Sequence, residues 1–236
     1  KAVLAKNKGV NTNQVLLGNG SDEVLDLLFR AFCEPKIDNI ISLPPTYGMY
    51  SVLSNLNNIE NREVLLTTDF QPKVDKILEA VDDNSKIIFL CSPNNPTGNS
   101  FTTESVTTLL EKFNGFVVID EAYIDFSDKA SWLEKLNQYP NLIITQTLSK
   151  AYGLAGIRLG ICYASAEVIA VLNKIKPPYN VNELTQLRAL ERLSDPEKIK
   201  SEIASIIQQR ESLLKVLNEV NFVEKIYPTE ANFILI

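Results

Sequence analysis

The stretch that decides the fold is Phe116-Val117-Val118-Ile119-Asp120-Glu121-Ala122-Tyr123. Four consecutive apolar residues predict a strand that is buried on both faces, and the first carboxylate follows where that strand ends. Open α/β sheets bind their ligands at the carboxyl ends of parallel strands. Asp120 is therefore expected to bind a ligand. The alternative is that this Asp caps the N-terminus of a following helix.

Similar apolar segments recur along the chain, separated by segments with helical spacing. Candidate strands lie at residues 15–17, 39–43, 63–65, 87–90, 116–119, 142–145 and 159–163. Between them, apolar residues recur at helical intervals, as at Val106, Leu109, Leu110 and Phe113. This alternation predicts an α/β three-layer sandwich, in which helices cover both faces of a mostly parallel sheet.

The pattern changes after the two prolines at residues 177–178. Two helical stretches follow, with a break at residues 194–196, and an apolar segment at residues 232–236 predicts a final strand. We therefore expect a large domain over residues 1–178 and part of a smaller α+β domain over residues 179–236. The chain opens on what is expected to be the middle of a helix and stops on a strand without a partner, which predicts a fragment with weakened or absent turnover.

Lys150 follows the candidate strand at residues 142–145, in the segment TLSKAYGLAGIRLG at residues 147–160. A lysine buried among apolar segments and hydroxyls would have a lowered pKa and could form a Schiff base with an aldehyde. Thr147, Ser149 and Arg158 would supply donors and a positive charge for a phosphate. An aldehyde that carries a phosphate is pyridoxal phosphate (PLP). The alternative is a solvated lysine in a surface loop.

Two further loops begin at strand ends. CSPNNPTG at residues 91–98 is a rigid turn that could aim Asn95 into the same site, or could be only a turn. GNGSDE at residues 18–23 precedes a helix whose free N–H groups at Ser21 and Asp22 could hold a phosphate, or it could be only a connector. It does not match the mononucleotide P-loop, because no Lys-Ser/Thr pair follows the glycines.

Composition limits the possible chemistry. A chain of 236 residues with 45% apolar residues can bury a substantial core, and its net charge of -6 argues against nucleic-acid binding. No apolar run approaches a membrane span. The three cysteines, Cys33, Cys91 and Cys162, favour reduced buried thiols and a cytoplasmic setting. The chain has no histidine, so it can form neither a Ser-His-Asp triad nor an imidazole metal site, and the general base must be another residue.

These segments, with PPTYGMY at residues 44–50 and PPYNVN at residues 177–182, resemble the fold-type I PLP-dependent aminotransferases over nearly the whole chain. Within them the chain is most similar to the histidinol-phosphate aminotransferase family. The resemblance implies that Lys150 carries the internal aldimine and acts as acid and base. It also implies that Asp120 pairs with the pyridinium, that Asn95 and Tyr123 contact the phenolic oxygen, and that Tyr47 stacks on the ring.

The same resemblance implies a phosphate site built from side chains and backbone groups. Its members would be Arg158, Thr147, Ser149 and the backbone of Gly20, Ser21 and Asp22. The implied reaction moves an amino group between L-histidinol phosphate and 2-oxoglutarate in histidine biosynthesis, in a cytoplasmic homodimer whose active site lies at the interface. No metal is implied. The arginine that holds the substrate cannot be assigned within these residues.

Three alternatives remain open on the sequence. Aromatic amino acid aminotransferases and threonine-phosphate decarboxylases share nearly all of these residues, because the residues hold the cofactor and not the substrate. A non-catalytic PLP-binding module is the third, although the chain shows no basic arm or DNA-binding helices that such a module could use.

Overall fold

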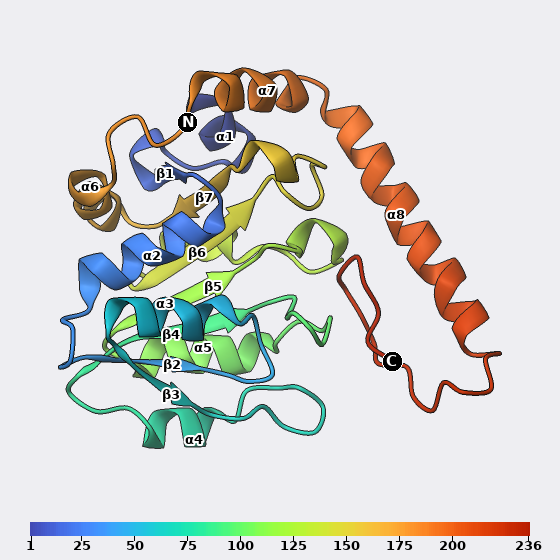
Figure 1. The fold of residues 1–236 in the computed structure, drawn as a ribbon, viewed down its shortest axis with the longest axis horizontal. Helices are drawn as coiled ribbons and strands as arrows, with labels where there is room; N and C mark the ends of the chain where they lie inside the picture. Colours follow the sequence, from blue (N-terminus) through green and yellow to red (C-terminus); the bar gives the residue numbers. More distant parts are fainter.

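The computed structural model describes residues 1–236 and shows one seven-stranded sheet between two layers of helices (Figure 1). The strand order is β1-β7-β6-β5-β4-β2-β3. Strands β2 to β6 are parallel to one another, and β7 is antiparallel to both β1 and β6. The strands are β1 (Val15–Gly18), β2 (Asn39–Ser42), β3 (Glu60–Glu63), β4 (Ser85–Cys91), β5 (Phe116–Asp120), β6 (Leu142–Thr147) and β7 (Gly160–Tyr163). The predicted three-layer sandwich with a mostly parallel sheet is confirmed.

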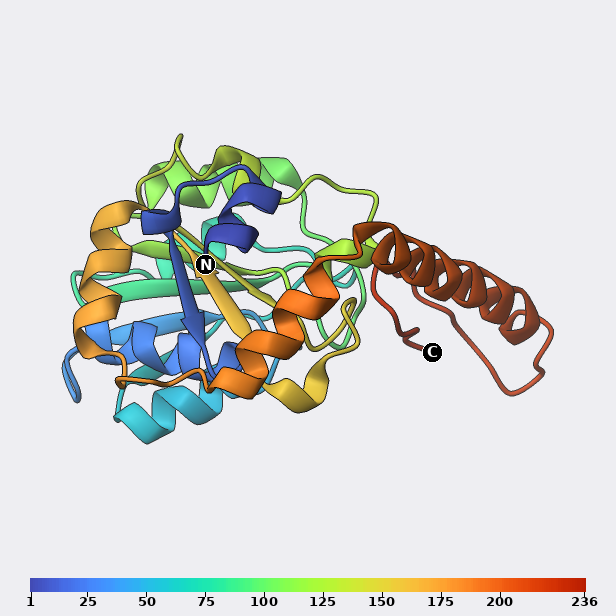
Figure 2. The same ribbon diagram turned by 90° about the horizontal axis from the view of Figure 1, so that it is seen from above.

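Helices cover both faces of the sheet, as the view from above shows (Figure 2). Alternate residues of β5 explain this, because Val117 and Ile119 belong to one buried cluster and Val118 to another. The first face is covered by α1 (Ala2–Lys8), α4 (Val74–Glu79), α5 (Thr103–Lys112) and α7 (Glu183–Leu193). The second face is covered by α2 (Ser21–Phe32), α3 (Met49–Asn57) and α6 (Ala166–Ile175).

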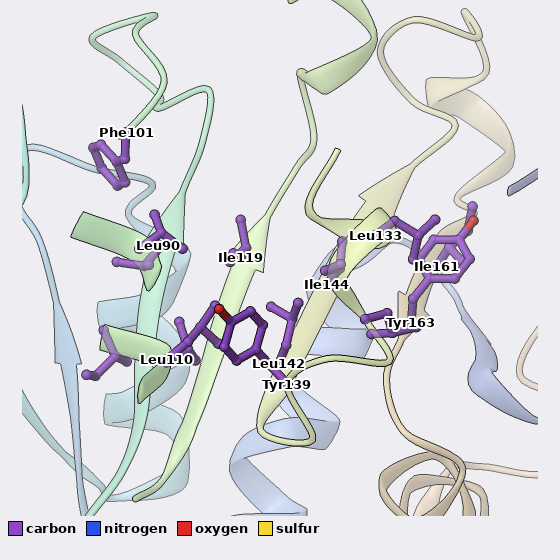
Figure 3. Packing of buried hydrophobic residues seen from close by; sticks show 14 of the residues in the cluster. Leu90, Phe101, Leu110, Ile119, Leu133, Tyr139, Leu142, Ile144, Ile161 and Tyr163 are labelled. Carbon is purple, nitrogen blue, oxygen red and sulfur yellow. The ribbon is translucent and has the colours of Figure 1, made fainter. Parts of the chain in front are cut away.

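The larger core cluster fills the first face with interlocking aliphatic and aromatic side chains (Figure 3). Leu90, Ile119 and Ile144 come from three adjacent strands and are fully buried. Leu110 packs on them from α5. The apolar face that the sequence predicts for this helix, formed by Val106, Leu109, Leu110 and Phe113, is entirely buried. Burial of this kind contributes about 1.5–3 kcal/mol for each large side chain, which holds the strand ends in fixed positions.

The last two helices are set by local capping groups. The Asn182 side chain accepts a hydrogen bond from the amide of Thr185 at 2.9 Å and starts α7. Asp195 accepts from the amide of Lys198 at 3.0 Å, and Pro196 begins α8 (Pro196–Leu217), so the predicted break at residues 194–196 is confirmed. Helix α8 extends away from the sandwich, and the C-terminal segment returns between α8 and the sandwich (Figure 1).

Two predicted strands were wrong. Residues 232–236 form no strand, although the amide of Tyr227 donates to the carbonyl of Leu235 at 3.0 Å in a short hairpin-like return. Strand β3 spans Glu60–Glu63 and not residues 63–65. It lies at the edge of the sheet and pairs only with β2, so its polar residues need no apolar neighbours and give no hydrophobic signal.

Short 3₁₀ turns complete the connections, at η1 (Thr12–Gln14), η2 (Ile124–Phe126), η3 (Trp132–Lys135) and η4 (Ala155–Ile157). Cys33, Cys91 and Cys162 are free and buried, as predicted. None of the helices combines the length and the apolar character that crossing a bilayer requires.

Candidate active site

A pocket with a cavity volume of about 160 Å³ lies at the carboxyl ends of β4, β5 and β6. This is the edge of the sheet where the strand-end polar residues were expected to meet. The structure brings together ten of the eleven predicted site residues here, and Gly20 lies directly beside Arg158. The lining residues are Ser21, Asp22, Tyr47, Cys91, Asn95, Asp120, Ala122, Tyr123, Thr147, Ser149, Lys150 and Arg158.

Asp120 ends β5 with only 2% of its surface exposed. Its Oδ2 accepts a hydrogen bond from the hydroxyl of Tyr50 at 3.0 Å, and its Oδ1 is buried without a partner. Burial raises the pKa of Asp120, and the neighbouring hydroxyls of Thr145 and Tyr50 oppose that rise. An unpaired buried carboxylate oxygen is costly, so this one indicates a site for a ligand donor.

Lys150 lies in the turn after β6, with its Nζ 5.3 Å from the centre of the Tyr123 ring. The expectation of a buried lysine was wrong, because the residue is exposed. The turn lies beyond the end of β6, where Leu148 and Ala151 are buried, and the Lys150 side chain lines the pocket. The amine is therefore accessible to an incoming aldehyde.

The phosphate site predicted at the start of α2 has backbone and side-chain parts. Gly20 has φ 87° and ψ 166°, a conformation that essentially only glycine adopts, and it places the first amides of α2 at the pocket. Arg158 reaches the same point from the turn before β7, and its Nη2 lies 3.3 Å from Asp22 Oδ2. A helix N-terminus beside a guanidinium suits a dianionic group.

Thr147 and Ser149 shape the turn on the other side of this site. The Thr147 hydroxyl accepts a hydrogen bond from the amide of Ser149 at 3.0 Å and donates to the carbonyl of Leu159 at 3.3 Å. These bonds tie the turn that carries Lys150 to the segment that carries Arg158. The Ser149 hydroxyl makes no hydrogen bond within the protein and lines the pocket.

The two adjacent asparagines of the loop after β4 have different roles. Asn94 is fully buried and holds the loop, because its amide donates to the carbonyl of Pro45 at 2.9 Å and to Thr97 Oγ1 at 2.7 Å. Asn95 is half-buried and lines the pocket near Tyr123. Burial raises the pKa of Tyr123 to about 12, and Asn95 opposes that rise. The hydroxyl of Tyr123 is therefore protonated at neutral pH and can donate a hydrogen bond.

Tyr47 closes the pocket from the loop before α3. Its hydroxyl donates to Asp22 Oδ1 at 2.9 Å, and its ring meets Tyr50 edge-on with the ring centres 5.7 Å apart. Burial, together with Asp22, raises the pKa of Tyr47 well above its usual range. A half-buried aromatic ring fixed at one edge offers its face to a flat ligand.

Three residues of the site were not predicted from the sequence. Cys91 and Ala122 line the pocket only because they sit at the ends of β4 and β5. Tyr50 supports Asp120 from behind the pocket, and it lies in the PPTYGMY segment three residues after Tyr47. Tyr47 precedes α3 whereas Tyr50 lies in its first turn, so no local pattern marked Tyr50 as a partner of Asp120.

These residues fit PLP. The unpaired Asp120 Oδ1 suits a protonated ring nitrogen, the start of α2 with Arg158 suits a phosphate, and the accessible amine of Lys150 suits an aldehyde. The three groups differ in charge as the three parts of the cofactor require. No cluster of three His, Cys, Asp or Glu side chains forms a candidate metal site.

The chain belongs to the class I and II aminotransferases, whose family it matches over residues 2–236. Its relatives narrow that class. It is 79% identical over its whole length to the histidinol-phosphate aminotransferase of Flavobacterium johnsoniae and 63% identical to that of Christiangramia forsetii. In each case it spans 67% of the relative's length.

Solved structures agree on the fold. A histidinol-phosphate aminotransferase from Sinorhizobium meliloti in complex with pyridoxal-5'-phosphate superposes with a TM-score of 0.90 at 23% identity, over 99% of this chain and 64% of that one. The enzyme from Clostridium acetobutylicum gives 0.89 at 22% identity, over 99% of this chain and 70% of that one. At these identities the likeness establishes the fold-type I architecture alone.

Proposed function

We propose that this protein is a PLP-dependent transaminase that moves the amino group between L-histidinol phosphate and 2-oxoglutarate in histidine biosynthesis. The observation that carries the proposal is the convergence of Lys150, Asp120 and Arg158 on one pocket. The substrate rests on identities of 79% and 63% to histidinol-phosphate aminotransferases, because the pocket itself holds the cofactor.

When bound, PLP supplies an electron sink for the carbanion that forms when a substrate loses its Cα proton. Asp120 keeps a proton on the ring nitrogen through its free Oδ1. Lys150 Nζ would act as the base that takes the Cα proton and as the acid that returns it, and the exposed position of this amine leaves it room to move.

The remaining residues bind and orient. Arg158, Thr147, Ser149 and the amides at the start of α2 hold the phosphate. Asn95 and Tyr123, which line the pocket, would donate to the phenolic oxygen of the ring, and Tyr47 would offer its ring to one face of the cofactor. Thr147 ends β6 and the amides belong to the start of α2, whereas the other groups lie in short turns beside the strands; this placement fixes their relative positions before substrate arrives.

Three further proposals concern the protein as a whole. The boundary of the large domain lies near residue 178, supported by the two prolines at residues 177–178; α7 still packs against the sheet beyond them, and α8 is the helix that protrudes (Figure 1). The protein is a homodimer, supported by large apolar side chains that α7 leaves exposed, Leu184, Leu187 and Leu190. It works in the cytoplasm, supported by three unpaired cysteines. Light scattering on the purified protein tests the dimer.

Rates of the first half-reaction test the substrate. Full-length protein loaded with PLP is mixed with L-histidinol phosphate, phenylalanine or threonine phosphate, and the cofactor absorbance is followed. We expect histidinol phosphate to react fastest and to release the ketone that forms when its amino group is transferred. A preference for phenylalanine or for threonine phosphate, the latter with release of carbon dioxide, assigns the protein to a different activity. Unchanged absorbance with all three indicates a binding module.

A further inference from the structure

Tyr50 is a fully buried residue of α3 that contacts the site from behind. Its ring stacks on Phe89 of β4 with the ring centres 4.8 Å apart and the planes 12° apart. Its hydroxyl donates to Asp120 Oδ2 at 3.0 Å. A helix on the second face of the sheet thereby reaches the carboxylate at the end of β5.

The two oxygens of Asp120 have different environments because of this bond. Oδ2 is occupied by Tyr50, whereas Oδ1 is buried and unpaired. A carboxylate that is held at one oxygen cannot rotate freely, so the other oxygen keeps a single direction. The hydroxyl also stabilises negative charge on Asp120, which burial alone disfavours.

Tyr50 is suited to remain the donor in this pair. Burial, and then the nearby Asp120 charge, raise the pKa of Tyr50 well above its ordinary value, so the hydroxyl keeps its proton over the whole working pH range. Hydrogen bonds to a buried charged group are among the stronger ones in proteins.

We propose that Tyr50 is a positioning residue, whose hydroxyl orients Asp120 and holds it ionised so that Oδ1 can pair with the protonated ring nitrogen of the cofactor. The inference rests on the proposed role of Asp120. It adds that the strength of this pair is set by a residue that never touches the cofactor.

The test measures binding of pyridoxamine 5'-phosphate, which binds without a covalent bond to lysine. Tyr50→Phe removes one oxygen and keeps the stacked ring. We expect this variant to bind the ligand about tenfold more weakly, as loss of one hydrogen bond to a buried carboxylate predicts. The ¹⁵N chemical shift of ring-labelled ligand should move toward that of the unprotonated pyridine.

A ligand analogue separates positioning from a general structural effect. In the analogue, C–H replaces the ring nitrogen, so Asp120 has nothing to pair with. Tyr50→Phe and the unchanged protein should bind this analogue equally, because the hydroxyl acts only through the nitrogen. A merely structural defect would weaken both ligands by the same factor, and that result overturns the inference.

Tyr163→Phe is the matched control. Tyr163 is also fully buried, but its hydroxyl has no hydrogen-bond partner, and it lies in the core cluster on the opposite face. This control should bind both ligands as the unchanged protein does. Thermal unfolding without ligand checks that both variants fold. A site-specific 3-fluorotyrosine at position 50, which keeps the hydroxyl and makes it a stronger donor, should tighten pyridoxamine 5'-phosphate binding.

Asp120→Asn distinguishes a failure of the role of Tyr50 from a failure of the role of Asp120. If Asp120→Asn weakens binding and Tyr50→Phe does not, the inference about Tyr50 is wrong and the proposed role of Asp120 stands. If Asp120→Asn leaves binding and the ¹⁵N shift unchanged, the proposed role of Asp120 is wrong as well.

Discussion

The guanidinium of Arg158 lies against the backbone of Gly20, so closely that a Cβ at position 20 would stand 2.5 Å from Nη2. The two residues are far apart in sequence and meet because β7 pairs with β1. Gly160 makes this approach possible, since a Cβ there would stand 2.3 Å from the carbonyl carbon of Gly20. The proposed phosphate site is thus built by the sheet pairing and not by either loop alone.

Gly20→Ala should damage this site and the fold together. The backbone conformation of Gly20 would cost about 1–3 kcal/mol with a side chain, and the new methyl would displace Arg158. We expect at least about tenfold weaker binding of PLP, measured by equilibrium dialysis, because the charged contact to phosphate is lost.

Gly9→Ala is the control for backbone strain. Gly9 also has a positive φ of 69°, but a Cβ there would meet nothing within 4 Å. It should lower the unfolding free energy by about 1–2 kcal/mol and leave PLP affinity unchanged. Equal affinities for the two variants would show that the contact between Gly20 and Arg158 has no role in binding.

Asn94 and Asn95 should separate stability from function. Asn94→Ala removes two hydrogen bonds donated within the buried loop and a third that it accepts from Thr46 at 2.9 Å. Chemical denaturation should show a loss of about 2 kcal/mol or more, since buried partners are left unsatisfied.

Asn95→Ala should leave the unfolding free energy within about 0.5 kcal/mol, because the side chain is half-buried and faces the pocket. The cofactor absorbance should instead titrate at a different pH, since one donor to the phenolic oxygen is lost. The opposite pattern, an unstable Asn95 variant and a spectrally altered Asn94 variant, would reverse the two assignments.

Asp120→Asn should stabilise the protein without cofactor while it damages function. Burial raises the pKa of Asp120 in the folded state, whereas the unfolded value is about 3.9. The folded state therefore binds more protons than the unfolded state between these two values, and the contribution of Asp120 to stability falls as pH rises through that window. Asparagine avoids this cost and can still accept from Tyr50.

The measurement is urea denaturation of both proteins, free of cofactor, between pH 4 and pH 8. We expect the advantage of Asp120→Asn to be largest near pH 8 and to shrink toward pH 4. An advantage that stays constant over that range would mean that ionisation of the buried Asp120 does not lower the free energy of unfolding.

Sequence patterns predicted the parts of this molecule that depend on burial or on turn chemistry. Apolar runs gave six strands and the covering helices, and the strand-end motifs brought ten residues to one pocket. Parts that depend on long-range pairing were missed. The antiparallel setting of β7 leaves no mark on the apolar pattern of residues 159–163, and the polar edge strand β3 has no apolar pattern at all.

Two site features required the three-dimensional structure. Lys150 was expected to be buried because its neighbours Leu148 and Ala151 are apolar, and those neighbours are buried while the lysine between them points out of the core. Tyr50 gave no sign of its contact with Asp120, because the two residues are 70 positions apart and their contact crosses from a helix to a strand end. Local patterns cannot specify such a pair.

Reduction of the PLP-loaded protein with borohydride, followed by peptide mass analysis, tests the central claim most directly. We expect a pyridoxyl group on Lys150 alone, and none in Lys150→Ala, whose turnover should fall by several orders of magnitude because the base is lost. Lys112→Ala, on the exposed side of α5, should be labelled and active like the unchanged protein. A pyridoxyl group on a different lysine, or on none, would contradict the assignment of this pocket.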